Sequence, residues 1–201
     1  MFKLIVAGFL AVATAGVIHD GNCPDIKPVE NFNVSAYQGV WYEISKFDHV
    51  YETSGKCSQA EYKLEGDVIK LKNSHVVDGV QKYIEGTAKL ADDANNSAKL
   101  VVTLNFGEAS KPSPLSVIAT DYSNYAIAYN CKYDETKKSH QDSLWVLSRT
   151  KSLEGEAKTA VDTYFKNNSK DIESSKLVQN DFSEEACKFT SSSPITERRK
   201  Q

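Results

Sequence analysis

The chain of 201 residues has no block of lysine and arginine before its last few residues, and its formal net charge is -3. A nucleic-acid-binding protein of this size usually carries a basic patch. The sequence therefore excludes nucleic acid as an expected partner.

No apolar run reaches the roughly 20 residues that a membrane-spanning helix needs. The first segment, MFKLIVAGFLAVATAG, instead combines one lysine, a short apolar stretch and a small-x-small cleavage site. This combination is typical of a secretory signal peptide. We expect residues 1–15 to be removed, the mature chain to begin near Gly16, and the protein to be secreted without a membrane anchor.

Motifs of common enzymes are missing as well. The sequence contains no G-x-S-x-G, no H-E-x-x-H, no G-x-G-x-x-G and no P-loop. Nucleophilic triads, catalytic metal sites and nucleotide sites are recognised through such patterns. No two cysteines have the C-x-x-C spacing of a zinc site. We expect neither an enzyme nor a metal site.

Cysteine is scarce, with only four residues: Cys23, Cys57, Cys131 and Cys187. In a secreted protein this even number predicts two disulfides, and the sequence leaves all three pairings open. Three N-x-S/T sequons, at which glycosylation is an open question, begin at Asn33, Asn95 and Asn167.

The sequence has no internal repeat and no long linker, so its length suits one domain. Short runs of β-branched and aromatic residues alternate with clusters of turn residues. We predict strands at 40–48, 57–65, 68–77, 80–91, 98–106, 114–121, 124–133 and 142–149. Eight strands at this spacing indicate an antiparallel up-and-down barrel or a sandwich.

One helix is expected after the strands. Residues 153–168 place apolar side chains near one stripe, namely Ala157, Ala160, Val161, Tyr164 and Phe165. This helix would lie on the outside of the sheet. The segment KLVQNDF favours a short strand. The polar residues 189–201 are expected to be a disordered tail.

The alternation of side chains assigns faces to several strands, since successive residues of a strand point to opposite sides. Asn73 and His75 fall on the apolar face of their strand, as do Leu104 and Phe106 of theirs. In GVWYEISKF, an inward Trp41 brings Glu43, Ser45 and Phe47 to the same side. A barrel of eight strands can hold one small ligand, which inward polar groups would orient.

Three separated motifs resemble those of the lipocalin family. GVW at Gly39 to Trp41 is similar to the family's G-x-W, TDY at Thr120 to Tyr122 with its Asp121 is similar to T-D-Y, and Arg149 matches the arginine that ends strand eight. The resemblance implies an eight-stranded antiparallel up-and-down β-barrel with one C-terminal α-helix packed outside. It also implies that the arginine packs across the tryptophan and closes one end.

Longer segments, among them HDGNCPDIKPVENF, GKCSQAEY and DFSEEACK, resemble the insect bilin-binding and insecticyanin group of lipocalins. The likeness spans about residues 19–188, within a lipocalin domain expected at 16–188. It implies noncovalent binding of biliverdin, chiefly the γ isomer, as a blue pigment of haemolymph or epidermis. It also implies the pairings Cys23–Cys131 and Cys57–Cys187. The alternative is another small hydrophobic ligand, such as a retinoid, fatty acid or hormone.

Alignment with the strands of this family implies a set of inward ligand-binding residues. They are Glu43, Asn73, His75, Ile84, Leu104, Phe106, Val117, Asn130, Lys132, Gln141, Ser143 and Trp145. We expect Lys132 to meet a propionate near the mouth and Glu43 to be a buried acid with polar partners. The loop at residues 48–54 would lie at the same mouth. The sequence leaves the oligomeric state open, a homo-oligomer included.

Overall fold

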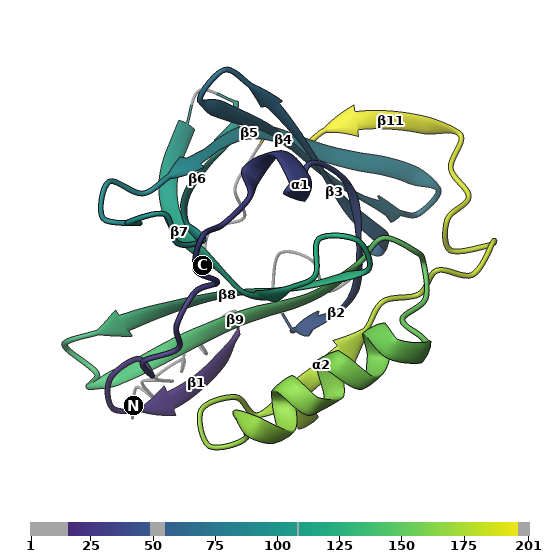
Figure 1. The fold of residues 1–201 in the computed structure, drawn as a ribbon. Coiled ribbons are helices and arrows are strands. Elements are labelled where there is room, and N and C mark those ends of the chain that lie inside the picture. The colour runs from purple at the N-terminus through teal and green to yellow at the C-terminus, as the bar shows by residue number, and fades with distance from the viewer. Residues whose placement is uncertain (1–15, 49–54, 108, 197–201) are drawn as a thin grey trace, which may run out of the picture.

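The computed structural model describes residues 16–48, 55–107 and 109–196 (Figure 1). The expected signal peptide and nearly all of the loop at 48–54 lie outside the described residues. In the part of the chain that is described, no helix has the length and apolar character needed to cross a membrane.

Eight antiparallel strands close into a barrel (Figure 1). They are β2 (Gly39–Phe47), β3 (Lys56–Glu65), β4 (Val68–Val77), β5 (Val80–Leu90), β6 (Lys99–Phe106), β7 (Ala109–Thr120), β8 (Tyr125–Asp134) and β9 (Ser139–Ser148). Each strand pairs with the next, and β9 returns to pair with β2. Closure satisfies the backbone groups that an open sheet leaves exposed. The barrel, and not the sandwich, is confirmed.

Shorter elements attach to this barrel. They are β1 (Val17–Asp20), α1 (Val34–Tyr37), α2 (Gly155–Asn167), a 3-10 turn (Ser174–Lys176), β10 (Leu177–Gln179) and β11 (Ser191–Pro194). The helix and the short strand β10 confirm the sequence predictions, whereas no sequence pattern indicated β1 or α1. The disulfides Cys23–Cys131 and Cys57–Cys187 confirm the pairing that the family resemblance implied.

Two apolar clusters hold the fold together. One fills the closed end of the barrel and contains Trp41, Tyr37 and Leu100. The other lies between the outside of the barrel and α2, where Val161 and Phe165 of the helix are buried. Burial of apolar area at about 25 cal/mol per Å² explains why α2 packs on the outer wall.

Arg149 closes the barrel end above Trp41, as the resemblance implied. Its guanidinium carbon lies 3.6 Å from the centre of the Trp41 ring. Its nitrogens donate hydrogen bonds to the backbone oxygens of Tyr122, Val40 and Ala36 over 3.0, 2.9 and 3.2 Å. One side chain therefore ties together three segments that meet at this end.

The turn that contains Thr120 and Asp121 is built by side-chain hydrogen bonds. The Asp121 carboxylate accepts from the backbone nitrogens of Ser123, Asn124 and Tyr125 over 3.1, 2.8 and 3.0 Å. Burial alone would raise the pKa of Asp121, but the hydrogen bonds from the Asn124 side chain and from these backbone groups outweigh it and lower the pKa.

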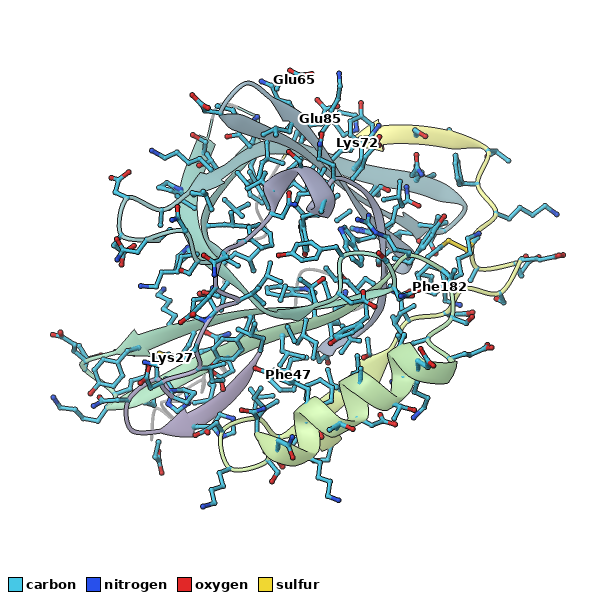
Figure 2. All side chains as sticks on the ribbon, in the orientation of Figure 1. Lys27, Phe47, Glu65, Lys72, Glu85 and Phe182 are labelled. Atoms are coloured by element: carbon cyan, nitrogen blue, oxygen red, sulfur yellow. A yellow bond between two sulfur atoms is a disulfide. The ribbon has the colours of Figure 1, made fainter. Side chains whose placement is uncertain are left out.

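A bulge in β2 changes the expected face of Phe47. The pairing of β2 with β9 shifts register between Glu43 and Ser45. One extra residue in one strand reverses the alternation beyond it. Phe47 therefore packs in the outer cluster beside α2 and not inside with Trp41 (Figure 2). The expectation that Phe47 shares the inner face is wrong for this reason.

Strand β7 begins at Ala109, five residues before its predicted start, and includes Pro112 and Pro114. Proline cannot donate a backbone hydrogen bond, so it is confined to strand edges. In β7 the prolines are tolerated because β8 pairs only with its second half, from Ser116 to Thr120. The first half is an edge on that side.

The tail is ordered where disorder was expected. Strand β11 pairs in parallel with β5, with Ser191 opposite Val80 and Pro194 opposite Tyr83. The expected disorder of residues 189–201 is thus wrong for the residues described up to 196. The tail is ordered because β5 has an open edge with which it can pair, and composition cannot reveal such an edge. Residues 197–201 lie outside the described part.

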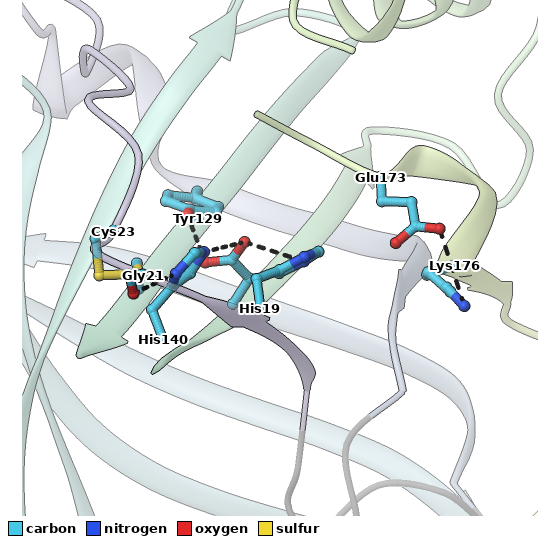
Figure 3. Close-up of polar contacts among 9 residues, drawn as sticks. His19, Gly21, Cys23, Tyr129, His140, Glu173 and Lys176 are labelled. Carbon is cyan, nitrogen blue, oxygen red and sulfur yellow. Dashed lines mark hydrogen bonds and ion pairs between the residues drawn. A yellow bond between two sulfur atoms is a disulfide. The ribbon is translucent and has the colours of Figure 1, made fainter. Parts of the chain in front are cut away.

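A buried polar cluster anchors β1 to β9 (Figure 3). The Asp142 carboxylate accepts a hydrogen bond from the Tyr129 hydroxyl over 2.6 Å, and the rings of His19 and His140 stack beside it. Burial raises the pKa of Asp142 despite these partners. Asp142, His140 and Cys131 lie close enough to share an ion, but the sulfur of Cys131 is bound in a disulfide.

Candidate ligand-binding site

The barrel encloses a cavity of about 530 Å³ beyond the closed end. This volume lies within the range of about 300–1,000 Å³ that is usual for small-molecule sites. Its wall is mainly apolar, with Leu71, Ile84, Leu104, Phe106 and Trp145 among its residues. An apolar compound of moderate size could therefore be enclosed.

Most of the sequence-predicted site residues line this cavity. They are Glu43, Asn73, His75, Ile84, Leu104, Phe106, Asn130, Ser143 and Trp145. They come from six different strands, so the barrel brings together positions that are up to about a hundred residues apart in sequence. The three other predicted residues, Val117, Lys132 and Gln141, do not line it.

Val117 lies at the closed end, where it is fully buried in the apolar cluster. Its backbone bonds the segment before α1, since the nitrogen of Val29 donates to its oxygen over 2.9 Å. Face alternation placed Val117 correctly on the inner side, but could not give its depth along the barrel.

Lys132 and Gln141 lie opposite each other two pairs beyond Asn130 and Ser143. At this height the β8–β9 hairpin has left the barrel, because β7 pairs with β8 only as far as Tyr129. Figure 1 shows the two strands running out beside β1. Lys132 is exposed there, so the expectation that it faces the cavity is wrong.

Several lining residues were missed. Strand β3 supplies Ser58, Gln59, Ala60 and Tyr62, and β5 supplies Lys82. The alternation of small and apolar residues in SQAEY could have suggested the β3 set. Pro194 and Ile195 of the tail also line the cavity. No sequence signal pointed to them, because their position depends on where the tail folds back.

Glu43 faces the cavity as expected and is 9% exposed. Its Oε1 atom lies 2.9 Å from Nζ of Lys46 and accepts a hydrogen bond from Nδ2 of Asn180 over 3.3 Å. The bulge in β2 turns Lys46 to the same side as Glu43. Burial, followed by the nearby charge of Glu43, raises the pKa of Tyr62 to about 12.

Asn73 and His75 both line the cavity from β4, which confirms the face that alternation assigned. The Oδ1 atom of Asn73 is buried and has no hydrogen-bond partner among the described residues. Gly55 lies against the imidazole of His75, since a Cβ added to Gly55 would lie 2.7 Å from that ring. Buried polar atoms are nearly always paired, so the unpaired oxygen makes the Asn73 amide an unsatisfied polar group in the wall of the cavity.

Comparisons with known proteins agree with this architecture. The model of the Lipocalin / cytosolic fatty-acid binding protein family matches residues 38–184. The Bilin-binding protein of Pieris brassicae is 49% identical over 188 residues, covering 94% of this chain and 98% of that protein. Insecticyanin-B of Manduca sexta is 43% identical over 201 residues, covering 98% of each chain.

The solved structure of insecticyanin from Manduca sexta superposes with a TM-score of 0.86 at 43% identity. It covers 90% of this chain and 97% of the insecticyanin chain. The family and these relatives are binding proteins, so the chain binds a small hydrophobic ligand and is not an enzyme. With its closed barrel, outer helix and Trp41–Arg149 closure, this chain belongs to the lipocalin family.

Proposed function

We propose that this protein is a secreted carrier that binds biliverdin, in its γ isomer, noncovalently in the barrel cavity. The complex would be a blue chromoprotein for pigmentation or storage. The similarity to the Bilin-binding protein and to insecticyanin over nearly the whole chain supports this ligand. The two disulfides and the signal-like first segment support secretion.

The observation that carries the proposal is the combination of a mainly apolar wall with the unsatisfied side-chain amide of Asn73. Biliverdin is a conjugated linear tetrapyrrole with N–H donors near its centre. Leu104, Phe106 and Trp145 offer apolar contacts to its rings, and the small Ala128 leaves room beside them. The Oδ1 atom of Asn73 can accept a pyrrole N–H.

The mechanism is enclosure. A preformed cavity holds the pigment in one conformation and separates it from water, which fixes its absorption spectrum. No covalent step is needed, since the contacts of an enclosed apolar ligand are sufficient for tight binding.

The test is a titration of the refolded mature chain, with both disulfides formed, with the α and γ isomers of biliverdin. We expect a red-shifted visible band and a strong induced circular dichroism that saturate at one ligand per chain, with tighter binding of the γ isomer. Retinol and a fatty acid are titrated in parallel. Binding of either one without any induced signal from biliverdin would favour the alternative carrier function.

Site variants make the same test specific. Asn73→Leu removes the acceptor and Phe106→Ala removes an aromatic wall residue, so each should weaken binding by about tenfold. Lys72→Ala is the matched control. Lys72 lies in the same strand as Asn73, but its ammonium lies over the Tyr83 ring, 4.5 Å from the ring centre. Equal loss of binding in all three variants would contradict the assignment of the cavity.

A further inference from the structure

The cavity wall has an opening between β5 and β6. Strand β5 pairs with β4 from Val80 to Ala88, but it pairs with β6 only from Gly86 to Leu90. The backbone of β5 before Gly86 therefore has an edge that β6 does not satisfy. Such an edge is available for another strand.

The C-terminal segment, defined here as residues 190–196, occupies this edge. The backbone nitrogen of Thr190 donates to the oxygen of Gly79 over 3.0 Å, and that of Ile195 donates to the oxygen of Tyr83 over 2.7 Å. At its far end the segment reaches Gly107, where an added Cβ would lie 3.0 Å from the oxygen of Thr196. The segment thus crosses from the β4–β5 turn to the β6–β7 turn (Figure 1).

The C-terminal segment also meets the cavity. Pro194 and Ile195 are part of its lining. The hydroxyl of Ser193 accepts a hydrogen bond from Nζ of Lys82 over 2.8 Å. Lys82 itself lines the cavity and lies opposite His75 in the strand pairing. By contrast, Ser192 donates to Gln81 on the exposed side over 3.1 Å.

We propose that the C-terminal segment is part of the ligand-binding site: Ile195 completes the wall between β5 and β6, and Ser193 holds the Lys82 ammonium at the cavity to bind a carboxylate of the ligand. The segment lies beyond residues 38–184, which the family model matches. It follows the last strand of the barrel, β9, by about 40 residues. The identity of the carboxylate ligand rests on the proposed function.

The position of the Lys82 ammonium at the cavity is the reason to expect a negatively charged group on the ligand. A carboxylate gains a short, charge-assisted hydrogen bond from a lysine, and a partly buried lysine is less screened by salt than an exposed one. The hydroxyl of Ser193 restricts where the flexible Lys82 side chain lies, which lowers the entropy lost when the ligand binds. Biliverdin carries two propionate groups that could use this contact.

The experiment measures binding and dissociation in the full mature chain with two ligands, biliverdin and its dimethyl ester. Lys82→Met should weaken biliverdin binding by about tenfold and leave ester binding unchanged. Ser193→Ala should produce the same selectivity with a smaller loss. Ile195→Ala should speed dissociation of both ligands by about tenfold, because it opens the apolar wall.

Two matched controls separate these effects from general damage. Ser192→Ala removes a hydroxyl from the same strand on the exposed side, and Val178→Ala trims an exposed apolar residue of β10. Both should match the parent chain, and all variants should keep its circular dichroism spectrum and Tm. The proposal is wrong if Lys82→Met and Ile195→Ala bind and release both ligands as the parent does.

Failure of the proposed biliverdin function can be distinguished from failure of this inference about the C-terminal segment. If the parent chain does not bind biliverdin, the same variants are measured with cis-parinaric acid and its methyl ester, whose fluorescence reports an apolar site. Selective loss of the free acid in Lys82→Met would then support the C-terminal segment as a binding element while biliverdin is abandoned. Equal binding in all variants, or binding of neither probe, would overturn this inference.

Discussion

The Glu43 carboxylate lies 2.9 Å from the Lys46 ammonium inside the barrel wall, with the two side chains 12% and 8% exposed. The residues are three apart in a strand, so regular alternation would place them on opposite faces. The bulge in β2 brings them to the same face. Glu43, which lines the cavity, therefore has a cationic partner that regular alternation did not predict.

Lys46→Met should destabilise the apo protein by about 3 kcal/mol, because it leaves a carboxylate buried without its cation. The double variant with Glu43→Gln should recover at least half of that loss. Urea unfolding measures both. Lys63→Met, at the exposed pair with Glu65, is the control and should change little. A loss in Lys46→Met no larger than in this control would contradict the role of burial.

Glu43→Gln alone should shift the visible band or lower the affinity of the biliverdin complex more than it lowers stability, since Glu43 lines the cavity. The comparison uses the absorption maximum, the dissociation constant and the urea midpoint of one preparation. If neither spectrum nor affinity moves, Glu43 is a structural acid.

Arg149→Lys should cost about 2–4 kcal/mol of unfolding free energy although it keeps the positive charge. The planar guanidinium donates to three backbone oxygens while it covers Trp41, and an ammonium on a different stem cannot reproduce that fork. Thermal unfolding with fluorescence detection measures the loss. A lysine variant as stable as the parent would show that charge alone closes the barrel end.

Gly39→Ala should destabilise by about 1–3 kcal/mol, because Gly39 has a φ of +96° and an added Cβ would lie 3.3 Å from Nη1 of Arg149. Gly21→Ala separates the two causes. Its φ is +86°, but nothing lies within 4 Å of the added Cβ. Urea midpoints that fall equally in both variants would mean that the contact with Arg149 contributes nothing.

Asp121 should contribute to the acid sensitivity of the fold. Its pKa is lowered in the folded state, so its stabilising effect is present above the unfolded pKa of about 4 and is lost as the pH falls through the lower folded pKa. Asp121→Asn should therefore unfold with a shallower dependence on pH between about 5 and 2. Identical slopes for the parent and the variant would contradict this assignment.

Face alternation and motif spacing anticipated much of the site. Asn73, His75, Leu104 and Phe106 line the cavity because a regular strand repeats every two residues, a property that the local sequence carries. Alternation failed at Phe47, where a bulge intervenes. The family alignment in turn did not predict the exposure of Lys132, because where the β8–β9 hairpin leaves the barrel depends on pairing with other strands.

Local periodicity determined the eight strands of the barrel and the outer helix. The motifs of fixed residues gave the resemblance to a family, and that resemblance implied the closed barrel and the contact of Trp41 with Arg149. Tertiary structure alone decided the pairing of Glu43 with Lys46 and the return of residues 190–196 to the edge of β5. The first depends on the bulge in the pairing of β2 with β9, and the second on the part of β5 that β6 leaves unpaired. Bulges and free strand edges both depend on pairing between distant strands, so no local pattern of residues records them.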